Sequence, residues 1–154
     1  MTTGLGVLAV AVVLALGFGL WRAATDGRFR GTHPVKGQHD PDPLVEPVET
    51  AAASVLAETS YDGQLGERAT LLQFSSAFCA PCRATRRVLD EVARIVPGVA
   101  HVEVDAEHHL DLVRRLGIVR TPTTLVLDPL GVEVSRATGA PSKQAVIASL
   151  EPLA

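Results

Sequence analysis

The sequence predicts an α/β domain with a central mixed β-sheet flanked by helices, preceded by one N-terminal transmembrane helix. Three observations predict it: an uncharged apolar run at the N-terminus, alternating strand-like and helix-like segments after residue 50, and a hairpin pattern near the C-terminus. At 154 residues, 47% of them hydrophobic, the chain is long enough for one globular domain with its own core. The net charge of −3 provides no basic field for nucleic acid, which excludes that class of partner.

The first element is the apolar run over residues 1–21, which contains no charged side chain. As a helix, most of this run would rise roughly 25 Å, close to the thickness of a bilayer core. Trp21, followed by a basic residue, suits a membrane interface. We therefore interpret residues 1–21 as an uncleaved transmembrane anchor. The alternatives are a buried soluble helix and a cleaved signal peptide ending near Gly17 and Gly19, although the run lacks the basic n-region of such peptides.

The residues that flank this run predict its orientation. Only the amino terminus precedes it, whereas Arg22, Arg28, Arg30 and Lys36 follow it. The positive-inside rule then predicts a single-pass membrane protein whose soluble domain is cytoplasmic, with an extracytoplasmic domain as the alternative. Residues 22–50 are rich in Gly, Pro, Asp and His without an apolar period, which predicts a flexible linker. The soluble domain occupies residues 51–154.

The soluble domain alternates between helix-like and strand-like patterns. In chain order we expect a short helix at 50–60, a strand at 69–75, a helix at 80–96, a strand at 99–105, a helix at 106–118, strands at 123–128 and 132–138, and a last helix capped by Ser142. A strand–helix–strand run implies parallel strands joined by a right-handed crossover. The terminal hairpin adds an antiparallel edge, so the sheet is mixed, with helices on both faces.

The only two cysteines, Cys79 and Cys82, lie where the strand at 69–75 gives way to the helix at 80–96. Free N–H groups and the positive end of the helix dipole favour a thiolate at the start of a helix. Pro81 is tolerated in the first turn, and Arg83, Arg86 and Arg87 add positive charge that lowers a thiol pKa. The two sulfurs face the same helical side, so Cys82 could attack a mixed disulfide formed on Cys79.

Two other interpretations of the pair come from the residues alone. A metal site would use Cys79, Cys82 and two of His101, His108 and His109, but the adjacent histidines point about 100° apart on a helix. A purely structural disulfide would be unusual at this short, accessible spacing. We expect neither a metal nor a cofactor.

The stretch FCAPCR at 78–83, opening a helix after an apolar strand, and RTPTTLVLD at 120–128 resemble the active site of thioredoxins and the loop that carries their cis-proline. The resemblance covers roughly residues 55–152 and implies a thioredoxin-like fold. It makes Cys79 the exposed nucleophile, Cys82 the buried resolving thiol, and Pro122 a cis-proline that faces the pair.

The same resemblance assigns further residues to the site. The substrate-binding positions are Phe78, Ala80, Pro81, Thr121 and Pro122, with the backbone of Thr121 offered to an extended client. The sequence also departs from the family, which usually has Trp at the position of Phe78 and Gly-Pro as the spacer. The buried aspartate of many thioredoxins falls on Gln73, and the basic residue opposite it falls on His101. Because Gln73 cannot accept a proton, base assistance would come from His101 or water.

These residues together predict a membrane-anchored thiol:disulfide oxidoreductase that exchanges disulfides with protein clients. A cytoplasmic domain favours a reductase in cell redox homeostasis, supplied by an upstream donor such as a thioredoxin reductase or a membrane thiol carrier. The alternative function is a non-catalytic redox sensor or interaction module in a membrane complex.

Overall fold

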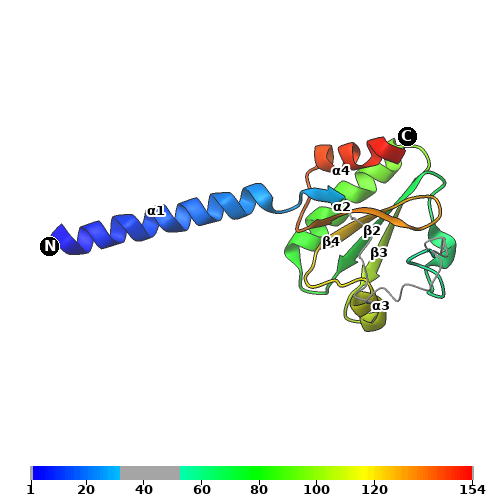
Figure 1. Cartoon of the computed structure of the whole chain (residues 1–154), viewed down its shortest axis with the longest axis horizontal. Helices are drawn as coiled ribbons and strands as arrows, with labels where there is room; N and C mark the ends of the chain where they lie inside the picture. The colour runs from blue at the N-terminus through cyan, green and yellow to red at the C-terminus, as the bar shows by residue number, and fades with distance from the viewer. Residues whose placement is uncertain (1, 32–52, 154) are drawn as a thin grey trace, which may run out of the picture.

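The computed structural model describes residues 2–31 and 53–153, and it separates an N-terminal helix from an α/β domain (Figure 1). Helix α1, Thr2–Thr25, projects away from the domain. Its large apolar side chains from Val7 to Trp21 are 48% to 71% exposed. None of the helices in the two described ranges is long and apolar enough to cross a membrane, so the structure does not support the expected transmembrane helix.

The domain is built on a five-stranded sheet with the strand order β1-β5-β4-β2-β3. The strands are β1 Phe29–Gly31, β2 Ala69–Ser75, β3 Val99–Asp105, β4 Thr123–Leu127 and β5 Glu133–Thr138. Strands β2 and β3 are parallel, while β4 pairs antiparallel with both β2 and β5. The prediction of a mixed sheet is confirmed, because the crossover supplies the parallel pair and the hairpin supplies the antiparallel one.

Strand β1 departs from the linker expected over residues 22–50. Phe29 to Gly31 pair antiparallel with β5, so β5 is not the edge of the sheet. The Gly27 N–H donates to the Thr138 carbonyl at 2.8 Å. Gly27 has a φ of 74°, and a Cβ there would lie 2.3 Å from the Ala140 carbonyl oxygen, so this close junction requires glycine. The linker residues from 32 onward lie outside the described residues, and the boundaries of anchor, linker and domain stay predictions.

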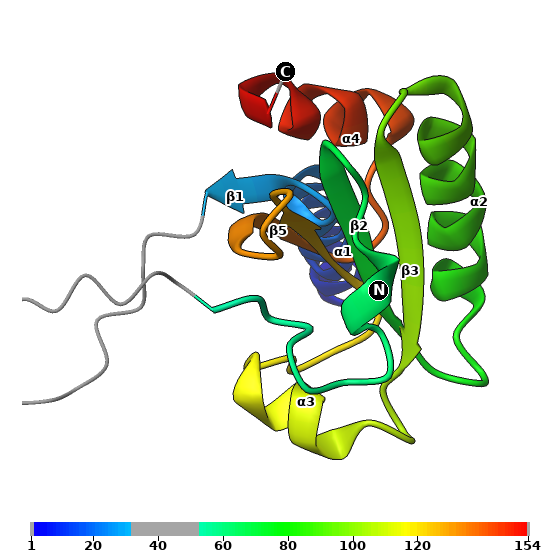
Figure 2. The same ribbon diagram turned by 90° about the vertical axis from the view of Figure 1, so that its right-hand side faces the viewer.

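The helices cover both faces of the sheet, as predicted. They are α2 Ala80–Ile95, α3 Leu110–Arg115 and α4 Lys143–Leu150, with short 3-10 helices at Asp62–Gln64 and Glu151–Leu153. Helices α2 and α4 pack on one face, and α3 lies on the side opposite α4 (Figure 2). The predicted cap of α4 is confirmed, since the Ser142 hydroxyl accepts from the Ala145 N–H at 3.2 Å.

Two predicted helices differ from the structure. The helix expected over 50–60 is wrong for residues 53–60, which form turns. The Ser54 hydroxyl accepts from the Leu56 N–H and the Thr59 hydroxyl donates to the Leu56 carbonyl, and such local bonds compete with a helix. The helix expected over 106–118 shortens to α3, because the Asp105 carboxylate accepts from the Glu107 N–H and holds the preceding residues in a turn.

The hydrophobic core lies on both sides of the sheet. The face under α2 and α4 buries Ala69, Leu71, Leu89, Val92, Val99, Val126, Val146 and Leu150. The opposite face buries Leu56, Leu72, Phe74, Val102, Val104, Leu112, Ile118, Leu125 and Leu127. Every residue of β2 is buried, and alternation along it places Gln73 on the same face as Leu71, toward α2. The strand therefore carries the Gln73 side chain into the space beneath the start of α2.

Candidate active site

Cys79 and Cys82 form a disulfide at the start of α2, directly after the loop that follows β2. Their sulfurs are 1.95 Å apart and their Cα atoms 5.2 Å apart. Cys79 is partly exposed as the N-cap of α2, whereas Cys82 is only 2% exposed. The Cys82 N–H donates to the Cys79 sulfur at 3.1 Å, which is the backbone contact expected to favour negative charge on that sulfur.

The outer side of the disulfide is apolar and exposed. Phe78 is 99% exposed, and Ala80 and Pro81 are exposed beside it. The Thr121–Pro122 peptide bond is cis, as predicted. Thr121 and Pro122 line a cleft of about 380 Å³ together with Pro81, so the structure brings the predicted client-binding residues of two loops together.

A side-chain hydrogen bond joins these two loops. The hydroxyls of Ser76 and Thr121 lie 3.2 Å apart, which ties the loop before Cys79 to the cis-proline loop. The sequence analysis did not single out Ser76, because only the spatial approach of the two loops gives it a partner.

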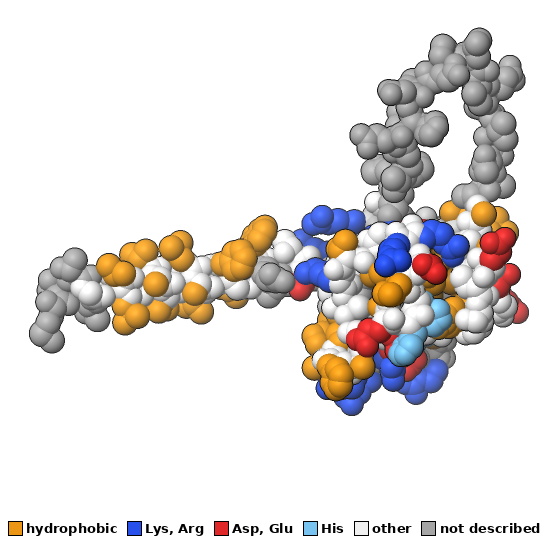
Figure 3. Space-filling model, turned by 90° about the horizontal axis from the view of Figure 1, so that it is seen from below, with side chains coloured by type: hydrophobic (Ala, Val, Ile, Leu, Met, Phe, Trp, Pro, Cys, Tyr) orange, Lys and Arg blue, Asp and Glu red, His pale blue; other side chains and the backbone are white. Residues whose placement is uncertain are grey.

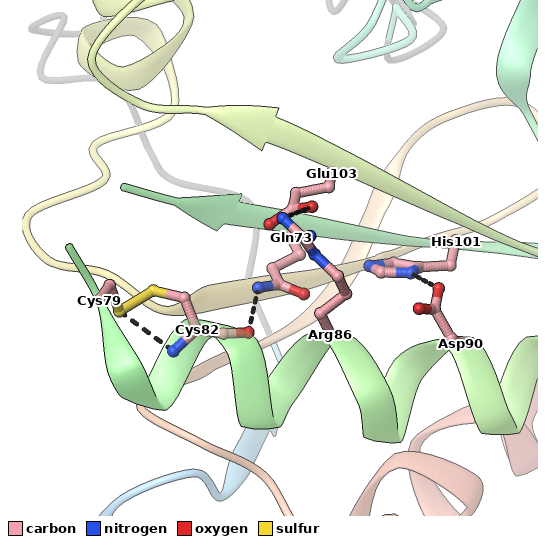
Figure 4. A network of polar contacts seen from close by, with 7 residues as sticks. All are labelled: Gln73, Cys79, Cys82, Arg86, Asp90, His101 and Glu103. Carbon is pink, nitrogen blue, oxygen red and sulfur yellow. Dashed lines mark hydrogen bonds and ion pairs between the residues drawn. A yellow bond between two sulfur atoms is a disulfide. The ribbon is translucent and has the colours of Figure 1, made fainter. Parts of the chain in front are cut away.

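On the inner side of the disulfide, the buried Gln73 side chain faces Cys82 (Figure 4). The Gln73 side-chain N–H donates to the Cys82 carbonyl at 3.0 Å. The other amide atom, Oε1, is buried and has no hydrogen-bond partner in the described part of the chain. Gln73, the predicted accessory residue, thus contacts the backbone of Cys82, the predicted resolving cysteine.

The other predicted accessory residue, His101, turns away from the sulfurs. Its Nδ1 lies 2.6 Å from the Asp90 carboxylate, and its side chain is 6% exposed. In Figure 4 this pair lies farther along α2 from Cys82 than Gln73 does. His101 does not line the cleft that holds the two cysteines, so the position expected for a base is occupied by a histidine paired elsewhere.

The histidines of the metal alternative are likewise engaged. His108 lies 2.9 Å from the Asp105 carboxylate, and His109 bonds to the Asp105 carbonyl and approaches the Tyr61 hydroxyl at 3.4 Å. In the described ranges, no three potential ligands converge on a metal-sized position.

Sequence reasoning missed an ion pair beside the cysteines. Arg86 of α2 pairs with Glu103 of β3, and both line a cleft of about 400 Å³ with Cys79 and Cys82. Its hydrogen bond to Glu103 raises the pKa of Arg86. Glu103 lies opposite Gln73 in the parallel register, and Arg86 lies one helical turn after Cys82. The strand register combined with the helix spacing could therefore have predicted this ion pair.

The acidic end of β3 completes this cleft. The hydrogen bond from His108, together with the Glu107 N–H, lowers the pKa of Asp105. Burial, with the nearby Asp105 charge, raises the pKa of Tyr61. The cleft therefore surrounds the two sulfurs with charged and polar groups from α2, β3 and the segment before β2.

Comparison with known proteins decides the family. The Thioredoxin family matches residues 52–152, which is more than half of the chain. The chain belongs to the thioredoxin family. It is 29% identical to Thioredoxin H4-1 of Oryza sativa subsp. japonica over 85 residues, covering 55% of this chain and 61% of that protein. It is 26% identical to the thioredoxin of Chlamydia trachomatis over 93 residues, covering 60% of this chain and 90% of that protein.

Solved thioredoxin structures share this fold. The thioredoxin of Fasciola hepatica aligns with a TM-score of 0.51 at 21% identity, covering 58% of this chain and 84% of that one. The reduced thioredoxin pre-protein of Schistosoma mansoni aligns with a TM-score of 0.51 at 20% identity, covering 60% and 83%. The chain spans about three fifths of the length of the plant thioredoxins it matches.

In this thioredoxin-family domain, the arrangement of the two sulfurs is suited to thiol–disulfide exchange. The partly exposed sulfur of Cys79 is bonded to the buried sulfur of Cys82, and both cysteines line one cleft. Such a pair can accept a bond from an outside sulfur and release it again without other reacting groups.

Proposed function

We propose that the protein is a thiol:disulfide oxidoreductase that acts on protein clients. The observation that carries the proposal is the bond between a partly exposed Cys79 and a buried Cys82 beside the cis Thr121–Pro122 peptide. The family match supports the same chemistry.

In the reducing direction, the Cys79 thiolate attacks one sulfur of a client disulfide. The client's disulfide breaks, its second sulfur leaves as a thiolate, and a mixed disulfide joins Cys79 to the client. The Cys82 thiolate then attacks the Cys79 sulfur and releases the client's first sulfur as a thiolate. Two electrons pass from the protein dithiol to the client, and the Cys79–Cys82 disulfide results.

We propose that the outer side of the disulfide contacts the client. Phe78 and Pro81 give an apolar contact, and an extended client segment would run along the Thr121 backbone in the adjoining cleft. We propose that the client is a protein segment and that the reductase direction is supplied by a thioredoxin reductase or a membrane thiol carrier.

Insulin reduction with dithiothreitol tests the proposed activity. An oxidoreductase turns over many insulin disulfides per molecule, and the Cys79→Ser variant turns over none. A single cycle per molecule would instead support a redox sensor, and full activity of Cys79→Ser would overturn the assignment of the nucleophile.

The direction of electron flow is tested by the reduction potential, measured by glutathione titration with alkylation of the free thiols. A value near about −270 mV supports a reductase. A value near about −120 mV would make the protein an oxidant and contradict that part of the proposal.

We further propose that the N-terminal segment anchors the domain at a membrane, with the domain on the cytoplasmic side. Its support is the absence of charge from residues 1–21 and the exposure of the apolar side chains of α1. Exposed apolar surface of this extent is stabilised by removal from water. Flotation of the full chain with neutral phosphatidylcholine vesicles tests the anchoring, and protease protection in cells tests the side.

A further inference from the structure

A cleft of about 520 Å³ lies where α1 meets the domain, away from the disulfide. Two aromatic side chains of α1 and four arginines from β1, β5 and the neighbouring loops line it: Phe18, Trp21, Arg28, Arg30, Arg120 and Arg136. Lys and Arg side chains gather at the base of α1 in the space-filling view (Figure 3). Four arginines from three separate parts of the sequence thus line one cleft.

Two of the four arginines have charge partners inside the protein. Arg120 pairs with Asp26 at 2.5 Å and also donates to the Thr138 carbonyl. Arg136 pairs with Glu133 at 2.6 Å. These pairs fix the walls of the cleft without adding net charge to it.

The other two arginines leave the cleft positively charged. Arg28 and Arg30 are exposed, and neither forms an ion pair with any residue in the ranges that the structure describes. The guanidinium group presents a planar fork of donors that matches a phosphate group. The cleft therefore offers two cations that have no ion-pair partner among the described residues and that suit a phosphate anion.

The two aromatic residues that line the cleft, Phe18 and Trp21, indicate which class of molecule would carry such a phosphate. The rings of Phe18 and Trp21 are tilted by 37° with their centroids 5.9 Å apart, and the two residues are 60% and 63% exposed. Toward the N-terminus, α1 presents only exposed apolar side chains among those described between Val7 and Leu20. A Trp at the end of an apolar helix, followed by arginines, matches the boundary between acyl chains and headgroups.

We propose that this cleft binds the phosphate of an anionic phospholipid headgroup, with Arg28 and Arg30 as its direct ligands and Trp21 against the lipid. The inference rests on the proposed anchoring of α1 in a membrane. A free phosphate compound would satisfy the arginines alone, whereas a lipid also satisfies the exposed aromatic and apolar side chains, so the lipid is the occupant the cleft fits.

Trp21 is the only tryptophan of the chain and lies in the cleft, so its fluorescence reports on the site directly. The full chain in neutral detergent micelles is titrated with dihexanoylphosphatidylglycerol or dihexanoylphosphatidylcholine. We expect a saturable change in Trp21 emission with the anionic lipid only. The double variant Arg28→Gln, Arg30→Gln should raise the half-saturating concentration about tenfold or more.

A matched control removes the same charge elsewhere. Arg87 and Arg114 are exposed and do not line the cleft, so Arg87→Gln, Arg114→Gln should leave the titration unchanged. Equal weakening by both double variants, or an equal response to the neutral lipid, would overturn the proposal. So would saturation by inorganic phosphate or by polyglutamate at lower concentrations than the lipid, which would assign the cleft to a free anion or to an acidic protein.

Flotation with neutral vesicles separates this proposal from the anchoring on which it rests. If the chain floats with phosphatidylcholine vesicles but Trp21 does not respond to phosphatidylglycerol, the cleft proposal fails and the anchoring stands. If the chain does not float but the arginine-dependent response persists, the anchoring fails and the anionic lipid site stands.

Discussion

The outer and inner sides of the disulfide differ in polarity and in charge. On the outer side, Phe78 and Pro81 are exposed and apolar. On the inner side, Gln73 is fully buried, and Arg86 and Glu103 form an ion pair beside it. The outer side therefore presents an exposed apolar surface, whereas the inner side places charged groups in the cleft that Cys82 lines. The two steps of disulfide exchange are therefore open to separate perturbation.

Replacing either cysteine should have the largest effect and should distinguish the two sides. Cys82→Ser leaves the partly exposed sulfur free, so mixed disulfides with clients form and accumulate, because nothing resolves them. Cys79→Ser leaves only the buried sulfur and should trap none. Non-reducing gels of alkylated samples measure both variants. More trapping by Cys79→Ser than by Cys82→Ser would reverse the roles of the two residues.

Two phenylalanines four residues apart sharpen the comparison next. Phe74 is fully buried in β2, whereas Phe78 is 99% exposed. Phe74→Ala should cost about 3–5 kcal/mol of unfolding free energy. Phe78→Ala should change that free energy by less than about 0.5 kcal/mol, while raising KM for a protein client. Urea unfolding and insulin kinetics measure the two. A large stability loss in Phe78→Ala would show that its side chain packs against the domain in solution.

Replacing Arg86 or Glu103 should shift the pKa of the Cys82 thiol in opposite directions. Glu103→Gln removes a negative charge and leaves Arg86 unpaired, so the pKa of Cys82 should fall by about half to one unit. Arg86→Gln leaves the carboxylate and should raise that pKa by a similar amount. The pH dependence of iodoacetamide alkylation in a Cys79→Ser background measures both. Shifts of the same sign would mean that the variants act through packing rather than charge.

The smallest expected effect concerns Asp105 at the rim of the inner cleft. The hydrogen bond from His108 lowers the pKa of Asp105. At pH values above about 4, the ordinary pKa of an aspartate, this contact therefore stabilises the folded state. That contribution is lost as the pH falls through the lowered value. Because the pair is exposed, His108→Ala should shift the urea midpoint only slightly at pH 7 and not at pH 2. A larger effect of His108→Ala at pH 2 than at pH 7 would contradict this origin.

Much of the fold could be predicted from local pattern. The strands at 69–75 and 99–105 have the predicted bounds, and the helix after Cys79 ends one residue before the prediction, since hydrophobic period and Pro97–Gly98 mark these limits. Strand β1 could not be predicted, because three residues carry no period and their pairing with β5 is a tertiary contact. The turns at 53–60 were missed because their side-chain hydrogen bonds override helix-like composition.

The candidate site divides in the same way. Both cysteines and the cis bond before Pro122 follow from motifs that lie within single segments. Glu103 and Arg86 belong to different elements, and they meet only when the register of β3 and the angle of α2 are known. The resemblance to thioredoxins assigned His101 as a possible base near the cysteines, whereas the structure pairs His101 with Asp90.

Strand β1 also determines how force would pass through the molecule. Strand β1 begins only a few residues after α1 ends. The chain is therefore hydrogen-bonded to β5 before it reaches residue 32. A pull on α1 would therefore load the β1–β5 hydrogen bonds, the Asp26–Arg120 pair and the Gly27–Thr138 bond first. A peptide-bond cut between residues 32 and 52 would leave α1 joined to the domain by non-covalent contacts, which include these bonds and the packing of Phe29 on the core, so the persistence of the two fragments as one particle measures their combined strength.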